Sequence, residues 1–332
     1  MLNTTAAPSP ALTLIADEMR AVDAVIQQRL GSEVPLVGQV AHYIIGAGGK
    51  RVRPALLLLV CGALGCTDAR RHTLAAVVEF IHTATLLHDD VVDESTLRRG
   101  RDTANQVFGN AASVLVGDFL YSRAFQMMVD CGEMRIMRVL ADATNVIAEG
   151  EVLQLMNMHD AHLDEAAYLR VIRAKTAKLF EASARLAAIL AGADPATEEA
   201  CATYGQALGA AFQIVDDVLD YEGDTAELGK NLGDDLREGK VTLPVICTLR
   251  RCTEPEAALI RTAIETGGTQ RLDEILAIVR RSGGLAEARA HAAAEAQRAI
   301  AAAQALPPGD AVREKYREAL LQLAAQLLTR RA

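Results

Sequence analysis

The chain has 332 residues, of which 51% are hydrophobic, so it carries enough apolar material to bury a large core. Its net charge of −9 argues against a general nucleic-acid-binding protein, although it is compatible with a local basic site for phosphate. Tryptophan is absent and aromatic residues make up only 4%, so aromatic platforms that stack bases are not expected.

The cysteines and apolar runs indicate the compartment. None of the six cysteines forms a CxxC pair, and no histidine pair accompanies them at zinc-finger spacing, so free buried thiols in a reducing compartment are expected. The first residues lack the basic and apolar regions of a signal peptide, and the longest apolar run, residues 55–66, is too short to cross a bilayer. A cytoplasmic protein without a transmembrane segment is therefore expected.

Along the chain, apolar residues recur at helical spacing. Residues 1–10 contain Thr, Ala, Ser and Pro and predict a disordered start. The predicted helices cover residues 11–30, 34–45, 54–64, 69–88, 110–130, 133–158, 164–191 and 197–221, and further helices follow residue 241. Segments 95–105 and 222–239 are predicted as polar loops. No run alternates long enough for a sheet, so an all-α fold is expected, with residues 11–332 forming one domain of long helices.

An acidic cluster in an apolar frame is the first candidate site. The segment LLHDDVVDE, residues 86–94, places Asp89 and Asp93 one above the other on a helix, with Asp90 three residues from Asp93. All three carboxylates are expected to point into one space. Buried carboxylates are costly without a positive partner, and Mg²⁺ prefers a few carboxylate oxygens together with substrate phosphates.

The same pattern returns 127 residues later (216 − 89), as Asp216, Asp217 and Asp220 in QIVDDVLDY. A solvated helix face often explains a single DDxxD, but it explains two copies in apolar frames poorly. We expect the two clusters to face each other and to hold several divalent ions around one polyphosphate.

Basic residues accompany both clusters. Gly48–Gly49 lets backbone approach an anion closely, and the nearby and later cations supply charge. Each cation alone could be an ordinary solvated side chain, and Arg98 or Arg99 could pair with Asp102 or Glu94. Together they predict a basic rim that suits diphosphate with Mg²⁺. The residues are Lys50, Arg51, Arg53, Arg98, Arg99, Lys175, Lys230 and Lys240.

One histidine shares the face of the first cluster. His82 stands two helical turns before Asp89 and follows Glu79 in an ExxH pattern. A ferritin-like di-iron bundle uses that pattern on two helices, and we find no second copy here. His82 is therefore interpreted as part of the phosphate site.

Five ordered motifs between about residues 40 and 245 carry a family resemblance. They are GGKRVRP, LLHDDVVDESTLRRG, KTAKLF, FQIVDDVLDY and LGKNLGDDLREGKVTLP. In this order they resemble the trans-isoprenyl diphosphate synthases, or polyprenyl synthases. The detailed sequence is most similar to the bacterial octaprenyl subfamily. The resemblance implies the all-helical isoprenoid synthase fold around a central cavity.

The resemblance also implies roles for single residues. Asp89, Asp90 and Asp93 would hold two or three Mg²⁺ ions on an allylic diphosphate from one side, and Asp216, Asp217 and Asp220 from the other. Contacts to the allylic substrate are implied for Arg98, Lys175, Thr176, Gln213, Lys230 and Lys240. An isopentenyl diphosphate pocket is implied for Lys50, Arg53, His82 and Arg99. Gln154 departs from the short-chain members, which often have an Asp there, and it would be a poor Mg²⁺ ligand.

The implied reaction is Mg²⁺-dependent head-to-tail condensation of isopentenyl diphosphate onto an allylic diphosphate such as farnesyl diphosphate. The allylic C–O bond ionises, the cation joins the isopentenyl double bond, and the departing diphosphate is our candidate for the base that takes the proton. The resemblance further implies a homodimer through residues 111–128 and 133–158, and a product near C40 for quinone side chains.

Product length is expected to depend on the residues one turn before Asp89. These are Ala84 and Thr85, which are small, whereas short-chain members carry bulky aromatics there. The cavity floor should therefore lie deeper, with Phe125 and Met128 as candidates. Ordinary core packing is the alternative for both.

Four other functions compete with this one. They are a synthase of shorter or longer chains, a terpene cyclase, a non-catalytic subunit of a heteromeric prenyl synthase, and a structural helical scaffold. A cyclase needs no isopentenyl diphosphate pocket, a non-catalytic subunit would be expected to lose carboxylates, and a scaffold does not explain the ordered motifs.

Overall fold

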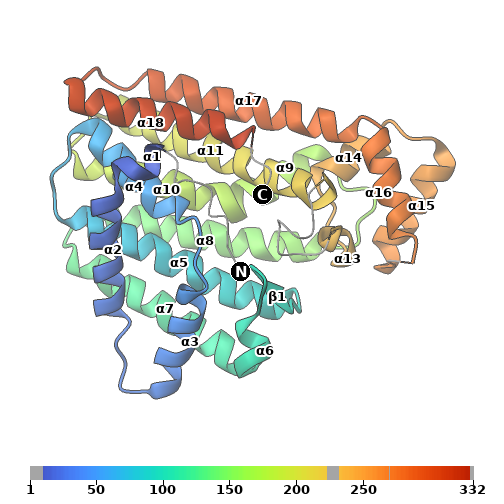
Figure 1. Cartoon of the computed structure of the whole chain (residues 1–332), viewed down its shortest axis with the longest axis horizontal. Coiled ribbons are helices and arrows are strands. Elements are labelled where there is room, and N and C mark those ends of the chain that lie inside the picture. Colours follow the sequence, from blue (N-terminus) through green and yellow to red (C-terminus); the bar gives the residue numbers. More distant parts are fainter. Residues whose placement is uncertain (1–9, 223–231, 269, 330–332) are drawn as a thin grey trace, which may run out of the picture.

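A computed structural model of the chain describes residues 10–222, 232–268 and 270–329. Almost all of these residues that have regular structure are helical, which confirms the all-α prediction (Figure 1). Strand is limited, within these ranges, to one antiparallel pair of two residues each, β1 (Leu97–Arg98) and β2 (Arg101–Asp102). The predicted disordered start, apart from Pro10, lies outside the described residues.

The first half of the chain supplies the helices around the candidate site. They are α1 (Pro10–Leu14), α2 (Ala16–Arg29), α3 (Pro35–Gly46), α4 (Val52–Leu64), α5 (Arg70–Val92), α6 (Ala104–Phe108), α7 (Asn110–Asp130) and α8 (Met134–Met156). In Figure 1, the axes of α5, α7 and α8 lie roughly parallel, and α2 stands across them at the end opposite β1.

The second half completes the bundle. Its helices are α9 (Glu165–Ile172), α10 (Lys178–Leu190), α11 (Pro195–Glu222), α13 (Asp234–Arg237), α14 (Leu243–Leu249), α15 (Glu254–Thr266), α16 (Leu272–Arg281), α17 (Gly284–Gln304) and α18 (Ala311–Leu327). The buried apolar side chains form two clusters, and α11 contributes its first half to one and its second half to the other. Whether residues 11–332 fold as a single domain stays a prediction.

Two glycines bring α11 close to its neighbour. A methyl group at Gly205 would clash with the backbone of Phe180, and one at Gly209 would lie 2.7 Å from Cα of Ala177. Because the glycines are four residues apart, they lie on one face of α11 and let it approach α10 closely. This approach sets the position of the second acidic cluster at the far end of α11.

Four predicted elements differ from the structure. One is the loop expected over 222–239, in which α13 forms a short helix. The helix expected over 11–30 is divided at Ile15, and the one over 164–191 contains a π-helical turn, η1 (Arg173–Ala177). The loop expected over 95–105 contains the β1–β2 hairpin and the start of α6. Its two turn residues, Arg99 and Gly100, have φ of 53° and 73°, as a type I′ hairpin turn requires.

In the part of the chain that is described, no helix is long and apolar enough to span a membrane.

Candidate active site

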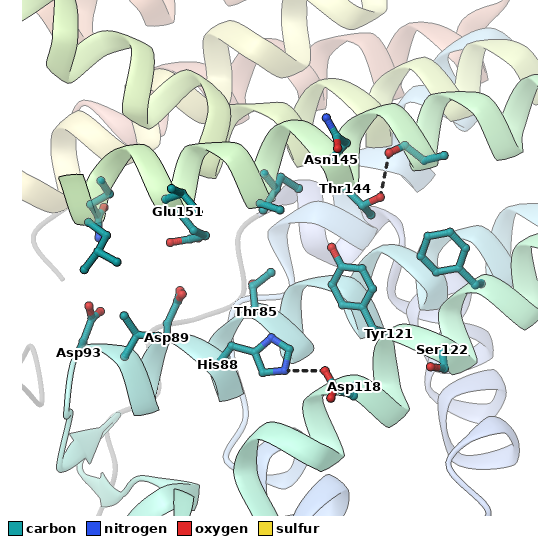
Figure 2. A pocket seen from close by; sticks show the side chains of 18 of the residues that line it. Thr85, His88, Asp89, Asp93, Asp118, Tyr121, Ser122, Thr144, Asn145 and Glu151 are labelled. Carbon is teal, nitrogen blue, oxygen red and sulfur yellow. Dashed lines mark hydrogen bonds and ion pairs between the residues drawn. The ribbon is translucent and has the colours of Figure 1, made fainter. Parts of the chain in front are cut away.

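A cavity of about 1480 Å³ lies between α5, α7 and α8. Its lining begins with Asp89 and Asp93 on α5 and continues past Thr85, Tyr121 and Phe125 to the far ends of α7 and α2. Figure 2 shows Asp89 and Asp93 pointing from α5 toward Glu151 on α8. The acidic groups therefore stand at one end of a long, mainly apolar space.

Two lysines meet the first acidic cluster. Lys175 Nζ lies 3.6 Å from Asp89 Oδ2 and 2.5 Å from Glu151 Oε2. Lys240 Nζ lies 2.7 Å from Asp93 Oδ2 and 2.7 Å from Glu238 Oε2. Each lysine is thus shared between an aspartate of the cluster and a glutamate from another segment. An anion bound at this site would compete with the glutamates for both lysines.

The π-helical turn carries Lys175 into the site. A methyl group at Gly150 on α8 would lie 2.8 Å from both Ala174 Cβ and the Lys175 nitrogen, so α8 and η1 are in close contact there. Such π-turns often mark functional sites, because the extra residue redirects the side chains of an α-helix. Here the turn directs Lys175 toward Asp89.

Asp90 does not share the cavity with its neighbours, which corrects the expectation that all three carboxylates point into one space. Its side chain is fully buried, and Arg98 donates to both of its oxygens over 2.6–3.1 Å. The partner of Arg98 is therefore Asp90, rather than Asp102 or Glu94. The hairpin turn after Arg98 places its guanidinium there, since the strand pair returns the chain to the end of α5.

The second cluster divides in the same way. Asp217, its middle member, is buried and accepts hydrogen bonds from the Tyr168 hydroxyl at 2.5 Å and from Gln213 Nε2 at 2.8 Å. Thr176 Oγ1 donates to Gln213 Oε1 at 2.8 Å and so fixes the amide. Asp216 and Asp220 are half-buried, one helical turn apart. In each cluster the middle aspartate is buried and bonded to other protein side chains, and the outer two lie nearer the surface.

Residues 233–240 connect the clusters. The backbone N–H groups of Asp234 and Asp235 donate to the Asp220 carboxylate at 3.2 and 3.3 Å. The Lys240 N–H then donates to the Asp235 carbonyl at 2.8 Å, and the Lys240 side chain reaches Asp93. Lys240 therefore stands between the two acidic groups.

Burial and crowding shift the acids of the site. The pKa of Asp89 is raised by desolvation and by Asp93, and Lys175 only partly opposes this. Desolvation and then Asp89 raise the pKa of Glu151 to about 7. Desolvation also raises the pKa of Asp217 well above its usual range, with Asp235 adding to the effect. Burial and crowding thus disfavour several negative charges in this site, so a bound cation would stabilise the ionised carboxylates.

A basic cluster, made of Lys50, Arg53, His82 and Arg99, lies near the first acidic cluster. Arg53 Nη1 is 3.2 Å from His82 Nε2, and the Arg53 guanidinium lies over the Phe180 ring at 4.6 Å. Burial lowers the pKa of Arg53 to about 10, and it lowers that of His82 so that the ring is neutral. Arg53 Nε is buried and has no hydrogen-bond partner among the described residues. An anion would supply that partner.

Gly49 lets another cation of this basic cluster approach the backbone closely. It has φ of 149°, and a methyl group there would lie within 2.7–2.9 Å of the Arg99 guanidinium. Arg99 is exposed, as is Lys50, and the pKa of Arg99 is lowered by desolvation and by Arg98. Desolvation raises the pKa of the facing Glu79 carboxyl, which weakens its negative charge. The basic cluster therefore concentrates positive charge, which favours an anion.

The donor set fits Mg²⁺ only in the presence of a further ligand. No group of three His, Cys, Asp or Glu side chains in the described ranges is arranged to hold a metal by itself. Mg²⁺ commonly takes one or two carboxylates and completes its shell with water and substrate phosphate oxygens. Asp89, Asp93, Asp216 and Asp220 are half-buried carboxylates of this type and are the candidates for such hard oxygen ligands.

Comparison with known proteins decides the family. The family model for polyprenyl synthetase matches residues 34–280. The chain belongs to this family. It is 52% identical over 312 residues to the octaprenyl diphosphate synthase of Escherichia coli K12, covering 94% of this chain and 95% of that relative. It is 45% identical over 320 residues to an all-trans-nonaprenyl-diphosphate synthase of Rhodobacter capsulatus, covering 96% and 97%.

Solved structures of polyprenyl synthases share the fold. One from Caulobacter crescentus, in complex with calcium and isoprenyl diphosphate, matches all of both chains with a TM-score of 0.93 and 44% identity. A decaprenyl diphosphate synthase from Rhodobacter capsulatus matches 97% of this chain and 98% of its own, with a TM-score of 0.89 and 46% identity. This chain is a long-chain trans-polyprenyl diphosphate synthase of a metal-dependent family. The assignment argues against the cyclase, di-iron and scaffold alternatives.

The candidate chain-length residues fall into two groups. Thr85 and Phe125 line the cavity of the polyprenyl synthase. Ala84 and Met128 are fully buried and do not line it. The roles of these residues in product length stay predictions, and Thr85, which lines the cavity, is the position to test. Lys230 lies outside the described residues.

Three residues of the site were not predicted. Glu151 shares Lys175 with Asp89, Glu238 shares Lys240 with Asp93, and Tyr168 binds Asp217. Glu151 left a signal, because it is an acid beside a glycine on an otherwise apolar helix face. Tyr168 left none, since an aromatic residue at helical spacing usually indicates ordinary core.

Proposed function

We propose that this polyprenyl synthase makes octaprenyl diphosphate, near C40, by Mg²⁺-dependent addition of isopentenyl diphosphate to an allylic primer such as farnesyl diphosphate. The observation that supports this most is the position of Asp89 and Asp93, with Lys175 and Lys240, at one end of the long apolar cavity. The similarity to the octaprenyl synthase relative supports this chain length. The relatives named for nonaprenyl and decaprenyl products make slightly longer products the alternative.

We infer that the allylic diphosphate binds between the two acidic clusters. Asp89, Asp93, Asp216 and Asp220 would hold two or three Mg²⁺ ions, which when bound stabilise the charge that develops on the leaving diphosphate. Lys175 and Lys240 would contact the diphosphate oxygens directly. Asp90 and Asp217 would act inside the protein, where they fix Arg98 and Gln213. The cavity between α5, α7 and α8 would then take the hydrocarbon chain and exclude water from the allylic cation.

Isopentenyl diphosphate would bind at the basic cluster. Arg53, Arg99 and Lys50 supply positive charge, and the neutral His82 can donate one ring N–H to a diphosphate oxygen. Phe180 is in contact with Arg53 and holds its guanidinium in place. The departing diphosphate remains our candidate for the base that takes the proton, because it is held closest to the reacting carbons.

Product analysis tests this function. The purified protein is incubated with farnesyl diphosphate, labelled isopentenyl diphosphate and Mg²⁺, and the dephosphorylated products are separated by chromatography. We expect a main product near C40 and no incorporation of label when EDTA removes the metal. A main product that stops at C20, one addition to farnesyl diphosphate, would overturn the long-chain proposal. No product from a folded protein would favour the non-catalytic subunit of a heteromeric synthase.

Thr85→Phe is expected to shorten the product to roughly C20, which is one addition to farnesyl diphosphate. Thr85 lines the cavity four residues, about 6 Å, before Asp89, so a phenyl group there narrows the path close to the reacting end. The first condensation should proceed at a rate near that of the wild type, because the acidic clusters are unchanged. The same chromatography measures the effect. Thr85→Ser, which keeps the cavity open, is the matched control and should still yield chains near C40. Long chains from a folded Thr85→Phe protein would mean that the product does not pass Thr85.

The enzyme is expected to be a homodimer through α7 and α8. Large apolar side chains on these helices are exposed, among them Leu115 at 66% and Met156 at 76%. Contiguous exposed apolar surface usually marks an interface. Light scattering should give about twice the 35.4-kDa chain mass at micromolar concentration. Leu115→Glu should shift the protein toward monomer, whereas Val312→Glu, at an exposed site on α18, should not. A wild-type protein that is monomeric would contradict the interface.

A further inference from the structure

An ion pair stands at the end of the cavity farthest from the acidic clusters. Arg29, the last residue of α2, is the one α2 residue that lines the cavity, and its Nη2 lies 2.9 Å from Asp130 Oδ2 at the end of α7. Gln126 and Val129 line the cavity beside the pair. Figure 1 shows α2 standing across the ends of α5, α7 and α8, opposite the end where β1 lies.

A second arginine fixes Arg29 in this position. Arg123 on α7 donates to the Arg29 carbonyl at 2.9 Å and to the Gly31 carbonyl at 3.2 Å. These hydrogen bonds satisfy carbonyls that are left unpaired at the C-terminal end of α2. The partial negative charge of that helix end also favours a cation there. The Arg123 guanidinium also lies over the Phe119 ring at 4.9 Å. Arg123 therefore holds the end of α2 against α7, which keeps the Arg29 backbone close to Asp130.

The lining changes character along the cavity. Asp118, Tyr121, Phe125, Val129 and Asp130 lie on one face of α7 at helical spacing, and Asp118 to Asp130 covers about 18 Å. Between these two acids the cavity is lined mainly by aromatic and aliphatic groups, including Ile147 and Ala148 on α8. The side chains of Arg29 and Asp130 are 36% and 53% exposed, so the pair meets the cavity on one side and water on the other.

We propose that the Arg29–Asp130 pair ends the path of the growing chain and so sets the upper limit of product length. This inference rests on the proposed long-chain function. Each added isoprene unit is stabilised while it enters apolar surroundings. At the pair, the next unit must separate two charges, remove their water or fold back on itself, and all of these oppose extension. The pair limits the chain through its hydration and position, since the attraction in a half-exposed ion pair is weak.

Arg29→Ala and Asp130→Ala are the direct tests. Each should open the far end of the cavity and lengthen the product by one or more C5 units, while the rate of the first condensation stays within about twofold of the wild type. Arg20→Ala is the matched control, because Arg20 lies on the same helix, pairs with Asp17 and does not line the cavity. Circular dichroism and thermal denaturation verify that each variant is folded.

The double variant Arg29→Asp/Asp130→Arg separates the ion pair from a general loosening of α2. It restores the pair with the charges exchanged and should return the product to the wild-type length. Two results would overturn the inference: wild-type length in both folded alanine variants, or long products from the exchanged pair. A wild-type protein that extends farnesyl diphosphate to C20 and no further would overturn the proposed function instead, because such a chain never reaches the far end.

Discussion

Asp89→Ala is expected to lower turnover by about 10²- to 10³-fold, the size of effect that follows the loss of one preorganised electrostatic stabiliser. Asp89 faces the cavity beside Lys175, and we propose it as a metal ligand for the leaving diphosphate. Its removal takes away charge stabilisation that is needed most in the transition state. Initial rates of labelled isopentenyl diphosphate incorporation measure the loss.

Asp216→Ala should cause a loss of the same order, because the second cluster is proposed to hold the same diphosphate from the opposite side. Asp17→Ala is the matched control, since Asp17 is an exposed aspartate on α2 that pairs with Arg20. It should leave the rate unchanged. Near-normal activity in either folded cluster variant would contradict the two-sided arrangement.

Arg98→Ala is expected to lower the free energy of unfolding by about 3–5 kcal/mol, the usual cost of leaving a buried charge without its partner. The Asp90 side chain is 0% exposed, and Arg98 is its charged partner through both carboxylate oxygens. Chemical denaturation of the protein without substrate measures this effect separately from any contact between Arg98 and the diphosphate.

The double variant Asp90→Leu/Arg98→Leu provides the control for this prediction. Replacing both partners of a buried ion pair by apolar residues is often close to neutral, whereas removing one partner is not. The double variant should therefore be more stable than Arg98→Ala. If Arg98→Ala unfolds like the wild type, water reaches Asp90 and the pair has no structural role.

The sequence by itself determined the family, the helical architecture and the two acidic segments. Their spacing was informative because a helix has a fixed period: Asp89 and Asp93, four residues apart, do share the cavity-facing side of α5. The cations were also predicted, since phosphate recognition needs positive charge near glycine-rich backbone. Helical periodicity predicts which residues are neighbours on one helix.

Only the tertiary structure decided what each acidic residue faces. Nothing in the sequence distinguishes Asp90 and Asp217 from the other aspartates of their clusters. In the structure Asp90 accepts from Arg98 of the hairpin, and Asp217 accepts from Tyr168 of a helix distant in sequence. Lys175 reaches Asp89 through a π-turn beside Gly150, and the end of the cavity depends on where α2 crosses α7. Each of these features results from contacts between segments far apart in the chain. Local periodicity carries no information about such contacts, because they depend on how the helices pack against one another.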